Sequence, residues 1–188
     1  MSWLLRFKDF KAVTHPPYVR LIGDKMYSKF MPAMDKSLGA LAHLLTKAEN
    51  HCTAHNIDEQ ALLGFRLFPD MFPMTRQVQL TCDFGARTAA RLAGVEPQSF
   101  ADVETTFNQL QERIKAVRAY MADFKEADFN GAETRAIVLK MRSGEKSFTG
   151  SSYLQDFSTP QFYFHMTTVY NILRHNGVTV GKRDFMGA

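Results

Sequence analysis

One histidine in an aromatic stretch is the residue best placed to do chemistry in this sequence. His165 shares a helical face with Phe162, Val169 and Ile172, which lie three residues before it and four and seven residues after it. This spacing predicts that the imidazole points into a helical core. A neutral imidazole there can serve as a metal ligand or a general base. The simpler interpretation is a core histidine satisfied by one hydrogen bond. The position four residues on, where a second histidine ligand would stand, is Val169.

A polar pair on an earlier helical segment is a candidate for orienting that histidine. Gln79 and Asp83 are four residues apart, so their side chains share a face. If this face met His165, the Asp83 carboxylate would hold the ring in one tautomer, as carboxylates do for metal-bound and catalytic histidines. The competing interpretation is a solvated pair, because polar helix positions generally face water.

Two further histidines have a spacing that can place both on one metal ion. His51 and His55 are one helical turn apart, with Cys52 between them and Asp58 shortly after. They lie at the polar end of a helical segment, and the glutamate of a metalloprotease pattern is missing. A solvated helix end is therefore the favoured interpretation. His175 lies in the last turn of another segment, where a cation is favourable, and needs no further role.

The composition is typical of one globular domain in a reducing cytoplasm. The chain has 188 residues, of which 45% are hydrophobic and 22% charged. Its two cysteines, Cys52 and Cys82, form no disulfide framework. No apolar run approaches the roughly 18 to 20 residues of a membrane span, and no secretory leader pattern is present. We therefore expect no membrane partner.

The net charge argues against a nucleic-acid partner once its distribution is considered. The formal charge is +4, but residues 1–25 hold five Lys and Arg against two Asp and Glu, which leaves 18 against 17 for the rest. A nearly neutral body matches a phosphate backbone poorly. Residues 1–25 are interpreted as an N-terminal appendage that adds little to the fold. They fit either a transit peptide or an extension that precedes a start at Met26.

Residues 26–188 are expected to form one domain built on four helices. The first runs from about Met26 to Ala54, the second from Thr75 to Ala93 with Gly94 as a left-handed cap, and the third through Phe124 with Asp102 or Thr105 as its cap. The last is expected to begin at Thr159-Pro160 and to end at Asn176 or Gly177.

The connections and the tail carry four more predictions. The apolar, proline-rich loop containing residues 64–73 is expected to lie against the bundle. A short β-hairpin is predicted from residues 135–141 and 146–150, with a turn at Ser143-Gly144. An earlier turn over residues 152–157 can lead into the last helix. The tail after Gly177 is expected to pack back through Val178, Val180 and Phe185 without forming an element of its own.

The inner face of the second helix is unusually small. Its members are Val78, Cys82, Gly85, Ala86, Ala89 and Leu92. Small side chains allow a neighbouring helix to approach closely, so this seam predicts a tight helix pairing or a contact between subunits. We expect a homodimer with two-fold symmetry that uses this face.

Two long stretches resemble an uncharacterised bacterial family within the DinB/YfiT-like superfamily. They are LLGFRLFPDMFPMTRQVQLTCDFGARTAARLAGVEP, at residues 62–97, and PQFYFHMTTVYNILRHNGVTVGKRDF, at residues 160–185. The resemblance covers residues 26 to about 187. It implies an all-α, DinB-like four-helix bundle, commonly a homodimer. Better-known members of the superfamily bind a divalent metal through three histidines and include thiol-dependent transferases and hydrolases.

The sequence departs from that metal pattern. Members with the site have one histidine near the start of the second helix and an H-x-x-x-H pair on a later helix. This chain offers Gln79, Thr81 and Asp83 in the first region and only His165 in the second. Because the three imidazoles that a metal would need are not all available there, we expect no cofactor. The alternative is a divalent metal such as zinc or nickel held by Asp83 and His165.

Three functions compete. The first is a non-catalytic or small-molecule-binding bundle, whose candidate ligand pocket holds Gln79, Asp83, Phe162, Tyr163 and His165, with Phe68 and Phe72 extending an aromatic wall. The second is a metal-dependent hydrolase or a thiol-dependent transferase with a mixed-ligand site. The third is a dimerisation module whose interface is the small face of the second helix. The sequence leaves open whether the chain is an enzyme.

Overall fold

The computed structural model describes residues 26–141 and 144–187, with side chains from Phe30 onward. The expectations for residues 1–25 and for the hairpin turn at Ser143 lie outside the described residues. Within the described ranges no helix is both long and apolar enough to cross a membrane.

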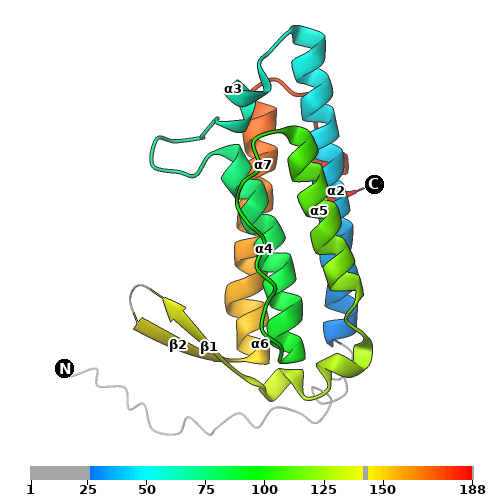
Figure 1. Ribbon diagram of the computed structural model, residues 1–188, viewed down its shortest axis with the longest axis vertical. Helices are drawn as coiled ribbons and strands as arrows, with labels where there is room; N and C mark the ends of the chain where they lie inside the picture. The colour runs from blue at the N-terminus through cyan, green and yellow to red at the C-terminus, as the bar shows by residue number, and fades with distance from the viewer. Residues whose placement is uncertain (1–25, 142–143, 188) are drawn as a thin grey trace, which may run out of the picture.

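Four long helices form the bundle: α2 (Met26–His55), α4 (Met74–Ala93), α5 (Phe107–Ala122) and α7 (Thr159–His175). In Figure 1, α2 and α7 run upward, whereas α4 and α5 both run downward. Helix α4 packs against α7 and α5, and α2 packs against α5. Because α4 and α5 are parallel, residues 94–106 must return along the length of the bundle between them (Figure 1). The predicted all-α four-helix bundle is confirmed.

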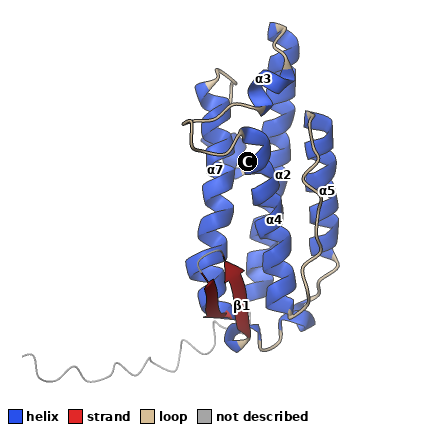
Figure 2. Ribbon diagram, turned by 60° about the vertical axis from the view of Figure 1, so that its left-hand side comes forward, coloured by secondary structure: helices blue, strands red, loops and turns tan. Residues whose placement is uncertain are grey.

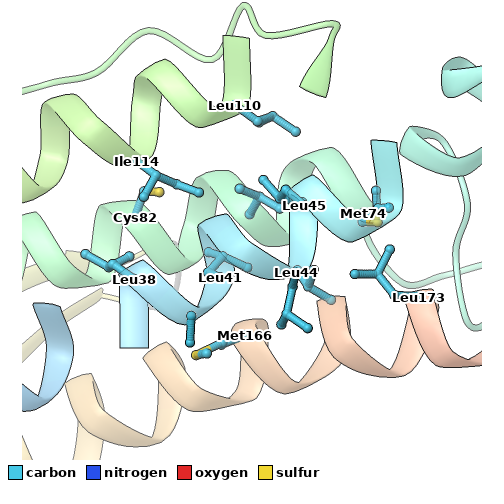
Figure 3. Packing of buried hydrophobic residues seen from close by; sticks show 14 of the residues in the cluster. Leu38, Leu41, Leu44, Leu45, Met74, Cys82, Leu110, Ile114, Met166 and Leu173 are labelled. Atoms are coloured by element: carbon cyan, nitrogen blue, oxygen red, sulfur yellow. The ribbon is translucent and has the colours of Figure 1, made fainter. Parts of the chain in front are cut away.

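The apolar stripes predicted from the sequence meet in one core. Leu38, Leu41, Leu44 and Leu45 of α2 are fully buried. Figure 3 shows these leucines lying among side chains of α4, α5 and α7, including Cys82, Ile114 and Met166. Side chains three and four residues apart share a helical face, so this stripe fixes which side of α2 turns inward.

The small face of α4 lies inside this core. Val78, Cys82, Ala86, Ala89 and Leu92 have no exposed surface. A Cβ added at Gly85 would contact side chains of Met121, Leu38 and Phe162, which come from α5, α2 and α7. Larger residues of the same chain therefore fill the space that the small residues leave. The prediction that this seam is a subunit interface is wrong, and the homodimer stays a prediction without a surface assigned to it.

The connection from α2 to α4 contains a short helix and an exposed loop. Helix α3 (Glu59–Leu63) buries its last two leucines. In the loop that follows, Phe68 and Phe72 are 63% and 53% exposed, so the expectation that the whole loop lies against the bundle is wrong. The loop folds on itself, because the Arg66 guanidinium donates to the Met71 carbonyl oxygen over 2.6 Å. Phe65, by contrast, packs on the core.

The ends of α4 and α5 are set by local hydrogen bonds. Gly94 caps α4 in the left-handed conformation, with φ of 78°, as predicted. The cap of α5 is Thr106, whose hydroxyl oxygen accepts from the backbone N–H of Gln109 over 3.2 Å. The prediction of Asp102 or Thr105 is wrong, because the Asp102 carboxylate forms ion pairs with two arginines and the Thr105 hydroxyl donates to the Gln109 side chain.

A β-hairpin lies beside the lower end of the bundle (Figure 2). After the 3-10 turns η2 (Glu126–Phe129) and η3 (Ala132–Thr134), strand β1 (Ala136–Met141) pairs antiparallel with β2 (Gly144–Thr149). The predicted hairpin is confirmed. Ile137 and Leu139 are buried in a second, smaller cluster with Leu92, Phe129 and Tyr153. Side chains alternate along a strand, so Val138 and Lys140 face outward.

The last helix begins earlier than Thr159. Helix α6 (Gly150–Ser152) is capped by Thr149, and the π-helical segment η4 (Tyr153–Ser158) continues directly into α7. Ser158 has helical backbone angles, so it does not interrupt the helix. Pro160 has no N–H and would break a regular α-helix at this point, whereas a wider π turn just before it accommodates the proline. At the other end, Gly177 is left-handed, with φ of 83°, as predicted.

The tail forms an element that the sequence did not indicate. Val178 and Val180 are buried and the Phe185 ring contacts Tyr170, as expected. However, Lys182–Met186 form helix α8. The Asp184 carboxylate accepts from the backbone N–H of Gly181 over 2.7 Å and from Lys47 of α2 over 2.9 Å. These bonds attach the short helix to the bundle.

We predict that a charge in the seam of α4 damages the fold rather than subunit association. Ala86→Glu should lower the free energy of unfolding by about 3 to 5 kcal/mol, because it buries an unpaired carboxylate in a filled core. Ala116→Glu, at an exposed position of α5, is the control and should leave urea unfolding unchanged. A stable, folded Ala86→Glu protein that had only lost a dimer in light scattering would contradict the placement of this seam.

Candidate functional site

The five residues predicted to line one ligand pocket are spread over three sides of the bundle. Phe162 has no exposed surface and belongs to the core. The Tyr163 hydroxyl lies 3.4 Å from Ser37 Oγ of α2. His165 faces Gln77 of α4, whereas Gln79 and Asp83 face the crossover and α5. Phe68 and Phe72 are exposed on their loop. A ligand pocket formed by these residues stays a prediction.

His165 is a buried histidine held by Gln77. Its Nδ1 lies 2.7 Å from Gln77 Oε1, and the Gln77 side-chain amide donates to the Phe72 carbonyl oxygen over 3.2 Å. Because the Gln77 amide nitrogen is used as this donor, the Gln77 oxygen faces the ring and Nδ1 must carry the proton. The imidazole lone pair is then on Nε2. The prediction of an inward-pointing histidine with one satisfying hydrogen bond is confirmed.

The surroundings of His165 keep it uncharged. Its ring stacks on Phe84, with centroids 5.7 Å apart and planes 15° apart, and Phe164 meets it edge-on. Burial, together with the positive charge of Arg76, lowers the pKa of His165 to about 4. At neutral pH the imidazole is therefore a weak base and a poor match for general-base catalysis. It remains suited to hydrogen bonding and to metal ligation, which both use the neutral ring.

Asp83 belongs to a buried ion-pair network rather than to the histidine. Its two oxygens accept from Arg113 over 2.6 Å and from Arg87 over 2.8 Å. The side chains of Asp83 and Arg113 are only 4% and 1% exposed. Arg113 also bonds Glu104 over 2.9 Å, and Gln79 donates to the other Glu104 oxygen over 2.8 Å. The expectation of a solvated Gln79 and Asp83 pair is wrong, as is the prediction that Asp83 orients His165.

The helical twist of α4 explains why Gln77 and Asp83 contact different helices. Gln77 and Asp83 are six residues apart, which turns their side chains about 120° away from each other around the helix. Gln77 therefore faces α7 while Asp83 faces α5. The sequence did not indicate Gln77, because no local pattern around it predicts a contact with a residue 88 positions away.

The other histidines lie where the sequence suggested. His51 and His55 are at the end of α2, with ring centroids 4.2 Å apart, and His55 Nδ1 lies 2.9 Å from the His51 carbonyl oxygen. His55 is exposed, in agreement with a solvated helix end. Within residues 26–141 and 144–187, no group of three or more His, Cys, Asp or Glu is arranged to hold a metal ion. The expectation that no metal is bound stays a prediction.

Both cysteines are buried thiols. Burial raises the pKa of Cys82 to about 12, and it also raises the pKa of Cys52. The thiolate is the nucleophilic form of cysteine. At neutral pH the two side chains therefore stay protonated, which makes them poor nucleophiles.

An apolar hollow of about 280 Å³ lies between α2, α5 and η2. Its apolar walls are Met31, Pro32, Met121, Phe124 and Phe129. Asp35 and Arg118 also line it, and they form a bidentate ion pair with distances of 2.7 and 2.9 Å. Glu126 of η2 is a further charged residue there. The sequence did not indicate this hollow, because its residues come from three segments that only the fold brings together.

We predict that Arg113 contributes far more to stability than an exposed cation on the same helix. Arg113→Gln should lower the free energy of unfolding by about 3 to 5 kcal/mol, because it leaves the Asp83 and Glu104 carboxylates without their buried partner. Lys115→Gln breaks an exposed pair with Glu112 and should leave urea unfolding within error of the unmodified chain. Equal, small effects of the two changes would contradict the network's role.

We also predict a pH dependence that comes from His165. In the unfolded chain this ring has an ordinary pKa of 6.5, whereas in the folded protein its pKa is about 4. As the pH falls, the unfolded state binds the proton first. Stability is therefore full above about pH 6.5 and is lost as the pH falls toward 4. Between about pH 7 and pH 5 the loss is roughly 2 kcal/mol.

Urea unfolding of His165→Gln at the two pH values isolates this contribution, and the exposed His55→Gln is the control. His165→Gln should lose about 2 kcal/mol less than the unmodified chain over this range, while His55→Gln should behave like the unmodified chain. If all three proteins lost the same free energy, His165 would not have the lowered pKa.

Comparisons with known proteins agree with this architecture. A crystal structure of a DinB family member protein from Shewanella denitrificans is similar to this chain with a TM-score of 0.83 and 39% sequence identity, covering 88% of this chain and 94% of that one. A search of curated proteins finds no significant match. The family model described as a domain of unknown function, DUF1993, matches residues 26–186. The chain therefore belongs to the DUF1993 family and has a DinB-like fold.

Proposed function

We propose that this protein is a non-catalytic, small-molecule-binding bundle whose ligand occupies the apolar hollow between α2, α5 and η2. The observation that carries this proposal is the hollow itself, which has about 280 Å³ of space, mostly apolar walls and a few charged groups. Ligand sites in proteins commonly combine these features, and this volume suits a small ligand.

The lining residues indicate what kind of molecule would fit. Met31 and Met121 are flexible and polarizable, so they can adapt to an irregular apolar body. Phe124 and Phe129 offer aromatic surface. Asp35 and Arg118 neutralise each other, and Glu126 then leaves one excess negative charge. A compact apolar group with an amine head therefore fits the hollow best.

Binding is favoured over catalysis because the reactive side chains are in unreactive states. The neutral His165 is a weak base, with a pKa of about 4. The thiol of Cys82 is protonated at neutral pH. The carboxylates of Asp83 and Glu104 are paired with the buried Arg113. These groups hold the fold together and are not free to transfer protons or to attack a substrate.

The alternative is a divalent-metal-dependent hydrolase or thiol-dependent transferase with a mixed-ligand site. The observation that favours it is the lone pair on Nε2 of His165, which is available to a metal such as zinc or nickel. The predicted second ligand, Asp83, opposes it, because both of its oxygens bind arginines. Near-stoichiometric metal in the purified protein, lost in His165→Ala, would favour the enzyme.

We predict that 2-phenylethylamine, an apolar ring with an amine head, binds in the hollow with roughly millimolar affinity, as expected for a fragment of its size. In protein labelled with carbon-13 at the methionine methyl groups, the NMR signals of Met31 and Met121 should shift on titration. The signals of Met74 and Met166, which are fully buried elsewhere in the core, should not.

Two substitutions on α5 sharpen this test. Ala122 lines the hollow and is exposed, so Ala122→Phe should fill the space and abolish the shifts. Ala116→Phe adds the same ring at an exposed position outside the hollow and should leave them intact. Shifts that persisted in Ala122→Phe, or that appeared at Met74 and Met166 instead, would overturn the assignment of the site.

A further inference from the structure

A second groove, of opposite charge, lies between α4 and the hairpin. One part has a volume of about 690 Å³ and is lined by Arg91, Arg135, Lys140 and Val138, with Glu96 at one side. A neighbouring part, of about 340 Å³, adds Phe84, Arg87 and Phe157. Arg91, Val138 and Lys140 line both parts, so the two form one continuous groove. Figure 2 shows the hairpin, whose strand β1 lines this groove, at the lower end of the bundle.

The geometry of β1 turns one face of the hairpin toward the groove. Ile137 and Leu139 are buried and anchor the strand on the smaller core. The alternating side chains, Val138 and Lys140, are exposed. Lys146 pairs with Leu139 in the hairpin register and so lies on the opposite face of the sheet from Lys140. The strand thus presents an ammonium group and an apolar side chain along the groove.

Neutral groups hold the two groove arginines in place. Arg91 donates to the Tyr153 hydroxyl over 3.0 Å, and its guanidinium lies 5.7 Å from the centre of that ring. Arg135 donates to the carbonyl oxygen of Leu92, at the end of α4, and to that of Asn130. These partners fix the orientation of each guanidinium without cancelling its charge, and each planar fork keeps further donors for an oxyanion.

The charges in the groove leave a positive excess. Arg87 is offset by Asp83. Of the remaining lining residues, Arg91, Arg135 and Lys140 carry three positive charges and Glu96 carries one negative charge, which leaves an excess of two. Glu145, opposite Lys140 in the hairpin register, lowers the excess to one if it is included. An anion is therefore the ligand that this groove attracts.

Apolar surface adjoins these cations. Val138 is 54% exposed on β1. Phe84 and Phe157 are half-buried and meet edge to face, with centroids 6.0 Å apart. Phe157 comes from the π-helical segment η4, so the wide turn before Pro160 helps to form this wall. A ligand with its oxyanion at Arg91, Arg135 and Lys140 can place an apolar group against Phe157 and Val138.

We propose that the groove between α4 and the hairpin binds a small organic oxyanion, a phosphate monoester that carries a flat apolar group. This site is separate from the apolar hollow between α2 and α5, which shares none of its lining residues. A test of this site therefore does not depend on the outcome of the test of the proposed function.

Titration calorimetry of the full chain with phenyl phosphate tests the proposal at low ionic strength. Phenyl phosphate should bind with a Kd of about 1 mM or below. Lys140→Gln should weaken binding about tenfold, because it removes a charge-assisted contact from an exposed strand position. Arg91→Gln should weaken binding by at least as much. Lys146→Gln removes the same charge from the other face of the hairpin and should leave the Kd unchanged.

Two further arms separate specific binding from general attraction to a basic surface. Inorganic phosphate should bind several-fold more weakly than phenyl phosphate, because it cannot contact Phe157 and Val138. Thermal unfolding checks that each variant remains folded. If Arg91→Gln does not remain folded, the comparison of Lys140→Gln with Lys146→Gln still decides the test. The absence of phenyl phosphate binding, or equal losses in Lys140→Gln and Lys146→Gln, would overturn the proposal. Equal affinity for the two phosphates would overturn the apolar part of the site.

Discussion

The arrangement of this bundle depends on the contacts that the buried Arg113 guanidinium makes. Because α4 and α5 are parallel, residues 94–106 have to cross the full length of the bundle without helical hydrogen bonds of their own. Arg113 reaches this segment from α5 and binds the Ala101 carbonyl oxygen and the Glu104 carboxylate, while it also holds Asp83 of α4. One side chain thus joins two helices and the crossover. A charge buried so fully is tolerated only with such partners, which explains why the acidic residues gather around it.

The lower end of the molecule follows from a second constraint, which is the proline near the start of α7. The helix that begins at Gly150 passes through a π turn before Pro160 and then continues to His175. The extra width of this turn fits a residue that cannot donate to the preceding turn. It also places Tyr153 against Arg91 and Phe157 against Phe84. The hairpin rests on the same segment, and the cationic groove forms where the strand, the π turn and α4 meet.

Burial determines the chemical state of the residues that could have been reactive. His165 is neutral, Cys82 is a protonated thiol, and Asp83 is bound by two arginines. These side chains are common in active sites, but here each is satisfied by a neighbour or kept uncharged by desolvation. Other charged residues line the apolar hollow and the groove between α4 and the hairpin. The proposed function in binding therefore rests on the apolar hollow rather than on these buried groups.

The sequence by itself determined the local features of this protein. Repeats at three and four residues defined the inward stripes of α2 and α5, Gly94 and Gly177 marked helix ends, and the β-branched run after Arg135 indicated the hairpin. Each of these signals depends on residues within one or two turns, so it can be read without knowing the fold.

Tertiary structure decided which side chains meet. The partner of His165 is Gln77, 88 residues away, and the buried partner of Asp83 is Arg113, 30 residues away. These pairings depend on how each helix is rotated against its neighbours. The same rotation placed the small seam of α4 inside the core, and no periodicity in a single segment determines it.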